Sequence, residues 1–242
     1  MNYPLPFTRT NLAKTGRILR ILGGMGVEFK GRRVLDIGCG TGNYCLPLAL
    51  KARSALGVDS STAMLKVFRA ERRKRGIKNA ACLRAVWSEL PAKKLRGRFD
   101  IALASMTMAI KNRADLLKME AAAGERCVYI GWAGVRRNAL MEKVYTEHGL
   151  EYKAPRGAEA MISALRSMKR EYSVRFIKDS WVKKSSPEET LRELEVSLRV
   201  NGARMKTEWV KELLKKFTRR GSVVQTTTVR KALITWRVPA AM

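Results

Sequence analysis

An aspartate and three evenly spaced glycines lie close together near the amino end of the chain. Residues 36–43 read DIGCGTGN, with glycine at 38, 40 and 42, and they follow the apolar pair Val34-Leu35. Glycine lets the backbone turn sharply and approach a ligand without an intervening side chain. The free N–H groups at the start of a following helix can then meet an anionic group. The spacing therefore predicts a ligand-binding turn between a strand and a helix.

Two classes of ligand are bound by turns of this kind. The dinucleotide fingerprint, G-x-G-x-x-G, needs its third glycine at position 43, where this chain has Asn43. The register here is G-x-G-x-G, and an acid, Asp36, precedes it by two residues. The pattern therefore favours a ligand other than a dinucleotide.

The turn is expected to lie in a series of alternating strands and helices. Segments that predict strands lie at 33–37, 55–59, 81–87, 99–106 and 126–132, and segments that predict helices lie at 10–23, 44–52, 62–75 and 113–123. Ser61 is a suitable N-cap for the helix at 62–75. Strands and helices that alternate at this spacing predict a parallel sheet built from βαβ units.

The pattern changes after Gly134. Residues 138–170 are expected to be helical, 172–182 extended and 207–219 helical, and Ser186-Pro187-Glu188-Glu189 predicts a helix start with a capping box. Two stretches rich in β-branched residues, 222–229 and 232–238, are predicted to form a hairpin joined by Arg230-Lys231. We therefore expect a seven-stranded sheet, with five parallel strands and a terminal hairpin, and a helical cap.

Four motifs in this order resemble those of the class I S-adenosylmethionine (SAM)-dependent methyltransferases. Residues 34–42 are similar to their motif I, in which an acid precedes G-x-G-x-G, and Asp59 is similar to their ribose-binding acid. The segment DSSTAML at 59–65 is similar to their D-x-S-x-x-M-L pattern, and FDIALA at 99–104 is similar to their fourth strand. The resemblance implies a three-layer αβα Rossmann-like fold and SAM as the cofactor.

With this resemblance, the chain divides into four expected parts. Residues 1–29 form an N-terminal helix or lid, 30–137 the SAM-binding core, 138–220 a helical cap that determines the substrate, and 221–242 the hairpin that completes the core sheet. The cap carries the least transferable sequence, so the acceptor of the methyl group cannot be named from it.

The resemblance also implies which residues contact the cofactor. Those expected at its methionine end are Asp36, Gly38, Cys39, Gly40, Gly42 and Asn43, those at the ribose are Asp59 and Ser60, and those around the adenine are Met64, Val86, Trp87 and Ser88, with Ala104 on the fourth strand. Many members have an aspartate where this chain has Val86, so the polar contact to the adenine is left to Ser88, Glu89 or the backbone. Two interpretations of Trp87 stay open, a wall of the adenine site and a tryptophan of the core.

The residues expected at the methyl-transfer site come from three places. They are Ser105, Met106 and Thr107 after the fourth strand, Trp132 at the end of the fifth, and Tyr3, which with Phe7 is expected to fold over the cofactor as a lid. No general base stands out. Methyl transfer by in-line displacement needs mainly position, with the nucleophile and the methyl held about 3 Å apart and water excluded.

The chain is strongly basic. It has 49 Lys and Arg against 21 Asp and Glu, a formal net charge of +28, and a pI near 10.6. Such a charge attracts polyanions and acidic substrates. The densest patch is KVFRAERRKRGIK at 66–78. It is interpreted either as a solvated helix face or as a surface that follows the phosphates of RNA, although no aromatic residues alternate with the charges as single-strand binding requires.

Several classes of protein and of site are not expected. No apolar run approaches the roughly 20 residues that span a bilayer, and the N-terminus lacks the apolar stretch of a secretory signal, so a cytoplasmic protein without membrane contact is expected. Four cysteines, at 39, 45, 82 and 127, form no C-x-x-C pair, and His148 is the single histidine. We therefore expect no metal site and no Ser-His hydrolase.

These observations lead to a ranked set of functions. The first is SAM-dependent methyl transfer to a small molecule. The excess of basic residues favours an anionic one. The alternative is an RNA methyltransferase, acting on rRNA or tRNA through the basic segment at 66–78. A minor alternative is a non-catalytic RNA-binding protein that keeps the SAM fold. The oligomeric state, monomer or dimer, stays open.

Asp59→Ala should weaken the binding of SAM by roughly 2–3 kcal/mol, because a pair of charge-assisted hydrogen bonds to the ribose is lost. Isothermal titration calorimetry with SAM measures the change. An unchanged affinity would contradict the assignment of Asp59 to the ribose.

Overall fold

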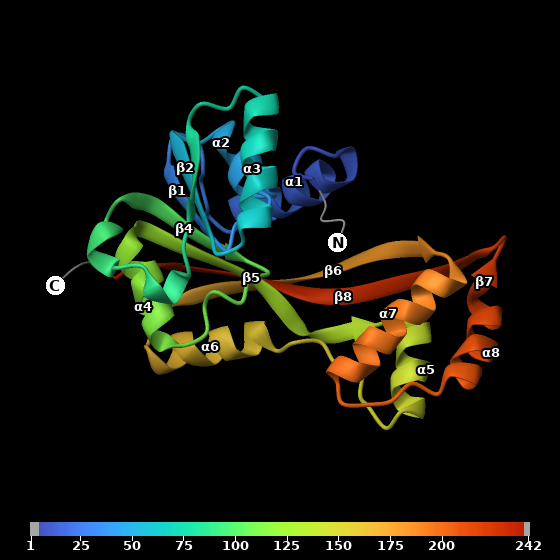
Figure 1. Ribbon diagram of the computed structural model, residues 1–242. Coiled ribbons are helices and arrows are strands. Elements are labelled where there is room, and N and C mark those ends of the chain that lie inside the picture. The colour runs from blue at the N-terminus through green and yellow to red at the C-terminus, as the bar shows by residue number, and fades with distance from the viewer. Residues whose placement is uncertain (1–4, 240–242) are drawn as a thin grey trace. The chain divides into compact units, whose positions relative to one another are not determined.

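The chain forms two compact units in the computed structural model, which describes residues 5–239 (Figure 1). The first unit comprises residues 1–131, 160–175 and 232–242, and the second comprises 132–159 and 176–231. Residues 160–175 thus group with the first unit, although the sequence places them in the cap. Among residues 5–239, no helix combines the length and the apolar character needed to cross a membrane.

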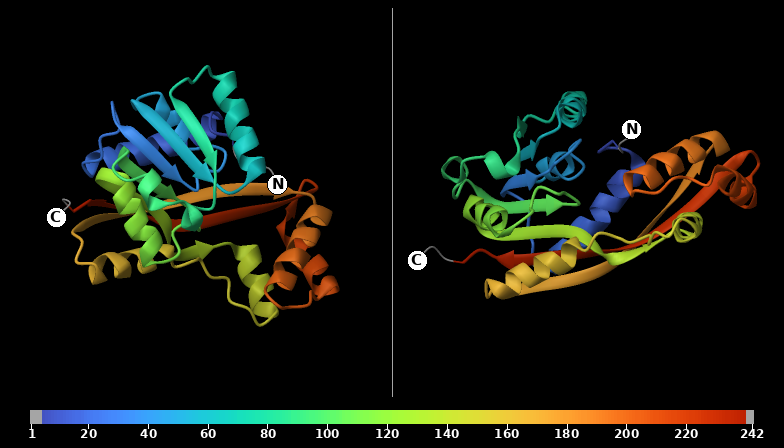
Figure 2. Two further views of the ribbon diagram at one scale, coloured as in Figure 1. Left: turned by 60° about the vertical axis from the view of Figure 1, so that its left-hand side comes forward. Right: turned by 60° about the horizontal axis from the view of Figure 1, so that its bottom comes forward.

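Five parallel strands run through the first unit, side by side in Figure 2. They are β1 (Arg33–Ile37), β2 (Ser54–Asp59), β3 (Ala80–Arg84), β4 (Phe99–Ser105) and β5 (Ala123–Arg137), and the order of the whole sheet is β3-β2-β1-β4-β5-β8-β6. β1 pairs in parallel with β2 and β4, β2 with β3, and β4 with β5. The five predicted parallel strands are confirmed, whereas the sheet has eight strands in the described residues instead of the seven expected, because β7 also pairs with β8.

Other elements cover both faces of the sheet at β1. Residues 34–37 of β1 are buried in succession, and since neighbouring side chains point to opposite faces, neither face meets solvent. The helices of the first unit are α1 (Arg9–Gly24), α2 (Cys45–Ala49), α3 (Thr62–Lys74) and α4 (Arg113–Ala122), with short 3₁₀ turns η1 (Trp87–Glu89) and η2 (Ala92–Lys94). Leu65 and Phe68 of α3 are fully buried in one core cluster with Leu46 of α2. The predicted cap of α3 is confirmed, since Ser61 Oγ accepts a hydrogen bond from Met64 N at 3.3 Å.

The hairpin expected at residues 221–242 is not formed. A single strand, β8 (Ser222–Arg237), lies between β5 and β6 (Tyr172–Ser185), and β7 (Thr218–Arg219) pairs with the start of β8. A two-residue hairpin turn needs residues that accept positive φ, such as glycine or asparagine, and Arg230-Lys231 has neither. Both side chains instead find partners within the second unit: Arg230 Nε donates to Ala133 O at 3.0 Å, and Lys231 Nζ donates to Asp179 Oδ2 at 2.6 Å.

The second unit builds its own core from helices. These are α5 (Ala139–Glu147), α7 (Pro187–Val200) and α8 (Thr207–Phe217), while the residues of α6 (Gly157–Ser167) fall in both units. Leu194 and Leu198 of α7 pack with Val210 of α8 in one buried cluster. The predicted start of α7 is confirmed, because Ser186 Oγ accepts from Glu189 N at 3.1 Å. The helix expected over 138–170 is interrupted at 148–156.

A buried carboxylate explains why residues beyond α6 belong to the first unit. Glu120 of α4 is 4% exposed and accepts hydrogen bonds from Arg170 Nε and Nη2, each at 2.9 Å. Its Oε1 also accepts from Trp236 Nε1 at 2.9 Å, near the end of β8. Because two donors of a guanidinium and an indole N–H meet this carboxylate, its buried charge is compensated. One side chain thereby joins three segments that are distant in sequence.

A second buried carboxylate lies under the glycine turn. Asp36 is 2% exposed, and its Oδ2 accepts a hydrogen bond from Cys45 N, at the start of α2, at 3.1 Å. Burial raises the pKa of Asp36 to about 7; the bond from Cys45 lowers it, and the charge of Asp59 raises it. Protonation of Asp36 therefore stabilises the folded state relative to the unfolded state.

Asp36→Asn should make the stability of the unliganded protein less sensitive to pH. The folded-state pKa of Asp36 lies above its ordinary value of 3.8, so the stabilisation is fully present below that value and is lost as the pH rises through about 7. Relative to the variant, the wild-type free energy of unfolding should fall by about 1.4 kcal/mol for each pH unit in the window between pH 3.8 and about 7. An asparagine keeps the acceptor for Cys45 N.

Urea unfolding of both proteins at several pH values across that window measures this difference. A difference that stays constant between the two ends of the window would contradict the raised pKa of Asp36.

Candidate active site

The turn after β1 holds all three of its glycines in the left-handed region. The φ angle is +70° at Gly38, +53° at Gly40 and +91° at Gly42. Other residues rarely adopt this conformation. The amides of Gly38 and Cys39 both donate to Val58 O, at 2.7 and 3.1 Å, so the end of β2 fixes the turn. The backbone alone therefore requires glycine at these positions.

The space around the glycines differs from one position to the next. A Cβ added at Gly42 would lie 2.7 Å from Phe68 and 2.9 Å from Leu46, so this glycine permits close packing between α2 and α3. A Cβ at Gly38 would lie 2.0 Å from Thr107 Oγ1. A Cβ at Gly40 would meet nothing within 4 Å. Of the three, Gly40 is thus the one beside open space.

The second acid of the motif lies at the end of β2 and holds the turn. Asp59 Oδ2 accepts a hydrogen bond from Gly40 N, and Oδ1 accepts one from Ser61 N, both at 2.8 Å. A carboxylate has about four acceptor sites on its two oxygens, so these bonds leave positions for a ligand. Asp59 therefore joins the glycine turn to the start of α3 and still presents acceptors.

These elements surround a cleft of about 270 Å³ at the carboxyl ends of the strands. Its walls come from the residues that follow β1, β2, β3 and β4, namely Gly38, Val58, Asp59, Ser60, Ala85, Val86, Trp87, Ser88, Thr107, Met108, Ala109 and Lys111. Ligands of open α/β sheets bind at this edge. The structure thus brings together seven of the residues singled out from the sequence: Gly38, Asp59, Ser60, Val86, Trp87, Ser88 and Thr107.

One wall of the cleft is apolar and fixed. Trp87 is 3% exposed, and its Nε1 donates to Asp115 O at 3.2 Å. Lys118 Nζ donates to the carbonyls of Trp87 and Ser88, at 2.9 and 2.8 Å, and lies over the indole ring at 5.6 Å. Val86 beside it is 39% exposed. Trp87 is therefore a buried tryptophan that also lines the cleft, and its role toward the adenine stays a prediction.

The loop after β4 forms the opposite wall. Met106 has φ +50°, and its N–H donates to Ile130 O at 2.7 Å. Thr107 Oγ1 accepts from Ala109 N at 3.1 Å, over Gly38. Ser105 Oγ is buried and has no hydrogen-bond partner among the described residues. Thr107 therefore lines the cleft, whereas Ser105 and Met106 are not among its lining residues and their roles toward the substrate stay predictions.

Two residues of the glycine turn, Cys39 and Asn43, are not among the residues that line the cleft and contact neighbouring elements, so their predicted roles toward the cofactor stay predictions. Cys39 is buried in the core cluster of α2 and α3, and burial raises the pKa of its thiol. Asn43 Oδ1 accepts from Asn11 Nδ2 at 2.9 Å, which ties the turn to α1. The sequence gives no signal that Cys39 packs against α2 and α3 or that Asn43 bonds to Asn11.

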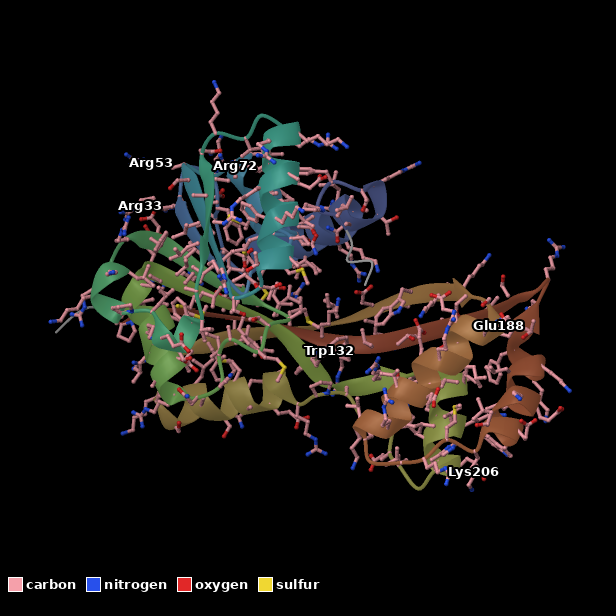
Figure 3. The ribbon with its side chains drawn as sticks, in the orientation of Figure 1. Arg33, Arg53, Arg72, Trp132, Glu188 and Lys206 are labelled. Carbon is pink, nitrogen blue, oxygen red and sulfur yellow. The ribbon has the colours of Figure 1, made fainter. Side chains whose placement is uncertain are left out.

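The other residues singled out from the sequence also lie apart from the cleft walls. Asp36 is buried under the turn, Ala104 is fully buried in β4, and Met64 is half-buried on α3. Phe7 packs against the α2–α3 core cluster, with the Arg75 guanidinium 4.8 Å from its ring. Tyr3 lies outside the described residues. Trp132, labelled in Figure 3, is half-buried on β5 in the second unit. The roles of these residues toward cofactor and substrate stay predictions.

Lys111 is the functional candidate that sequence reasoning missed. It lines the cleft together with Met108 and Ala109, and its N–H donates to Asp115 Oδ2 at 3.1 Å. Its position just before Asn112, the N-cap of α4, was the available signal. Among the residues that line the cleft, Asp59 and Lys111 are the two charged ones. Within residues 5–239, no three His, Cys, Asp or Glu side chains are grouped as metal ligands.

Comparisons with known proteins extend the description of this site. The profile of the family described as "Methyltransferase domain" matches residues 28–180. The 23S rRNA (uracil(1939)-C(5))-methyltransferase RlmD of Burkholderia pseudomallei is 42% identical over 65 residues, which are 25% of this chain and 13% of RlmD. An uncharacterized protein of Haemophilus influenzae is 26% identical over 122 residues, which cover 49% of this chain and 43% of that protein. The chain thus matches only about an eighth of the length of RlmD.

Solved structures share the fold over nearly the whole chain. The YcgJ protein of Bacillus subtilis has a TM-score of 0.59 and 15% identity, covering 95% of this chain and 99% of its own. A putative methyltransferase of Bacillus halodurans has a TM-score of 0.58 and 14% identity, covering 96% and 100%. The family profile covers more than half of the chain, and the glycine turn, Asp59 and the sheet have the expected arrangement. The chain therefore belongs to the methyltransferase-domain family, the SAM-dependent methyltransferases of the class I Rossmann-like fold.

Proposed function

We propose that this enzyme transfers the methyl group of SAM to a small anionic acceptor. The observation that carries the proposal is Lys111, the one cation among the residues that line the cleft. It lies on the loop after β4, which the family resemblance assigns to the substrate side. An ammonium group there can form a charge-assisted hydrogen bond with a carboxylate or phosphate of the acceptor.

The residues of the cleft fit the cofactor. SAM supplies a methyl group bonded to a positively charged sulfur. Asp59 keeps acceptors for the ribose hydroxyls beyond the two bonds to Gly40 and Ser61. Val86 and Trp87 offer an apolar wall to the adenine. The side chain of Thr107 lies over Gly38, where the resemblance places the methionine end of the cofactor. We therefore expect the Thr107 side chain to move when the cofactor binds.

The cleft leaves little room beside the cofactor. Its 270 Å³ is below the roughly 300–1,000 Å³ of typical ligand pockets, so the cofactor takes most of it and the acceptor meets the methyl at the rim. There Thr107 and Lys111 position the acceptor, and position is the main requirement of an in-line displacement. Apart from Asp59, none of the residues that line the cleft has a carboxylate or an imidazole that could act as a base. This suits an acceptor whose attacking group is a neutral amine, a carboxylate or a thiolate.

The cysteines give no support to a covalent mechanism. A nucleophilic cysteine needs a lowered pKa and access to the substrate. Burial instead raises the thiol pKa of Cys39, Cys45 and Cys127, and none of the residues that line the cleft is a cysteine. Attack by the acceptor itself on the methyl group is therefore the proposed chemistry.

RNA is the second candidate acceptor, and the distribution of charge favours it. The first unit carries 30 of the 49 basic residues but 10 of the 21 acidic ones. On α3, Lys66, Arg69, Arg73 and Lys74 are exposed. The similarity to part of RlmD, an rRNA methyltransferase, points the same way. A basic surface of this kind binds polyanions in a salt-dependent manner.

Transfer of a radioactive methyl group should separate the two acceptors. The enzyme is incubated with methyl-labelled SAM and a bacterial extract divided into small molecules, RNA and protein. We expect label in small molecules that an anion exchanger retains. Label that appears in RNA and disappears after ribonuclease treatment would overturn the small acceptor, and label in no fraction despite SAM binding would favour the non-catalytic alternative.

Lys111→Met should reduce methyl transfer to the labelled anion about tenfold, because one charge-assisted hydrogen bond is lost. The affinity for SAM should stay within about twofold of the wild type. Lys93→Met, a change of the same charge on η2 outside the cleft, is the matched control. Equal losses in both variants would show a general effect of charge and contradict the role of Lys111.

A further inference from the structure

A second cavity of the first unit lies at the opposite edge of the sheet. It has a volume of about 390 Å³ and is lined by Arg32, Arg126 and Arg237, with Glu28 and Glu125. Arg32 directly precedes β1, and Arg126 lies near the beginning of β5. The cavity is therefore at the amino ends of the parallel strands, whereas the cofactor cleft is at their carboxyl ends. In Figure 3, Arg33 marks this edge at the start of β1.

The pairing of the strands brings the arginines together. Arg126 lies opposite Ile101 of β4 in the parallel register. Arg237 is the last residue of β8, and the next amide, Val238 N, donates to Glu125 O at 3.0 Å. This bond holds the end of β8 beside β5, and Arg126 and Arg237 both line the same cavity. Three segments far apart in the sequence each contribute one arginine.

The carboxylates of the cavity do not balance these charges. Glu125 Oε1 accepts from Arg32 Nη1 at 2.6 Å, and Glu28 Oε1 accepts from Lys30 N at 3.1 Å. Among residues 5–239, neither Arg126 nor Arg237 forms an ion pair; Arg126 Nη1 has the Thr235 hydroxyl at 3.4 Å. Burial and the charge of Arg237 lower the pKa of Arg126, and the charge of Glu125 raises it, so the pKa is lowered overall. Two like charges therefore face one partly desolvated space, an arrangement that a bound anion relieves.

We propose that this cavity binds a phosphate dianion, free or carried as a small monoester, between Arg126 and Arg237. Planar guanidinium groups bind phosphate oxygens through paired N–H donors, and two arginines match the double negative charge. The volume leaves room for more than the phosphate itself, which favours a monoester. The basic excess of the first unit attracts such a ligand from solution.

Calorimetric titration of the full chain with ribose 5-phosphate, ribose and inorganic phosphate tests this site. These probes carry no adenine, so they do not compete for the cofactor cleft through that group. Ribose 5-phosphate should bind saturably and ribose should not. Tighter binding of ribose 5-phosphate than of inorganic phosphate assigns a monoester, and equal binding assigns free phosphate. No saturable binding of either anion would overturn the proposal.

Arg126→Gln and Arg237→Gln should each weaken the binding at least tenfold. Arg126→Lys keeps the charge but not the paired donors, so an intermediate loss is expected. Arg73→Gln removes the same charge from an exposed position of α3 and should leave the binding within twofold of the wild type. A loss in Arg73→Gln as large as in Arg126→Gln would overturn the site. Thermal unfolding shows whether each variant folds. Arg237 is exposed, so Arg237→Gln is expected to fold and tests the site even if Arg126→Gln does not.

Discussion

The two hydrogen bonds of the Asp59 carboxylate hold together the walls of the cleft at the carboxyl ends of the strands. One oxygen takes the amide of Gly40 and the other takes the amide of Ser61, so a single side chain fixes the glycine turn of β1 to the start of α3. The turn cannot change its position relative to β2 without breaking these bonds and the two amide bonds to Val58 O. A carboxylate held in this way needs little reorganisation to meet a ligand, which lowers the cost of binding.

The sequence was sufficient for the elements whose signals are local. The bounds of β1, β2, β4 and α3 differ from the predicted ones by at most a residue or so, since each combines an apolar run with a turn or a cap next to it. β8 shows where such signals end. Stretches rich in β-branched residues flank Arg230-Lys231, and the lack of a glycine or asparagine there is the one local signal against a hairpin. The partners of the two side chains, Ala133 and Asp179, are supplied by other parts of the chain.

The same distinction applies to the site. The positions of Asp59, Val86 and Thr107 follow from strand ends, because the carboxyl ends of parallel strands meet at one edge. The packing contacts that require glycine at 38 and 42 could not be predicted from the sequence. Gly42 is surrounded by Phe68 and Leu46, and Gly38 by Thr107, and these contacts depend on how helices and loops pack. Lys111 belongs to no motif, so only the structure shows it beside the cleft.

The discontinuity of the first unit limits how the enzyme can be divided. Every residue that lines the cofactor cleft lies between 38 and 111, yet Glu120 depends on Arg170 and Trp236 for its hydrogen bonds. A fragment that ends near residue 131 would contain the whole cleft and still bury a carboxylate without its donors, which is strongly unfavourable. A shortened chain that keeps the cleft intact therefore also has to keep Arg170 and Trp236, or to replace the donors that they give to Glu120.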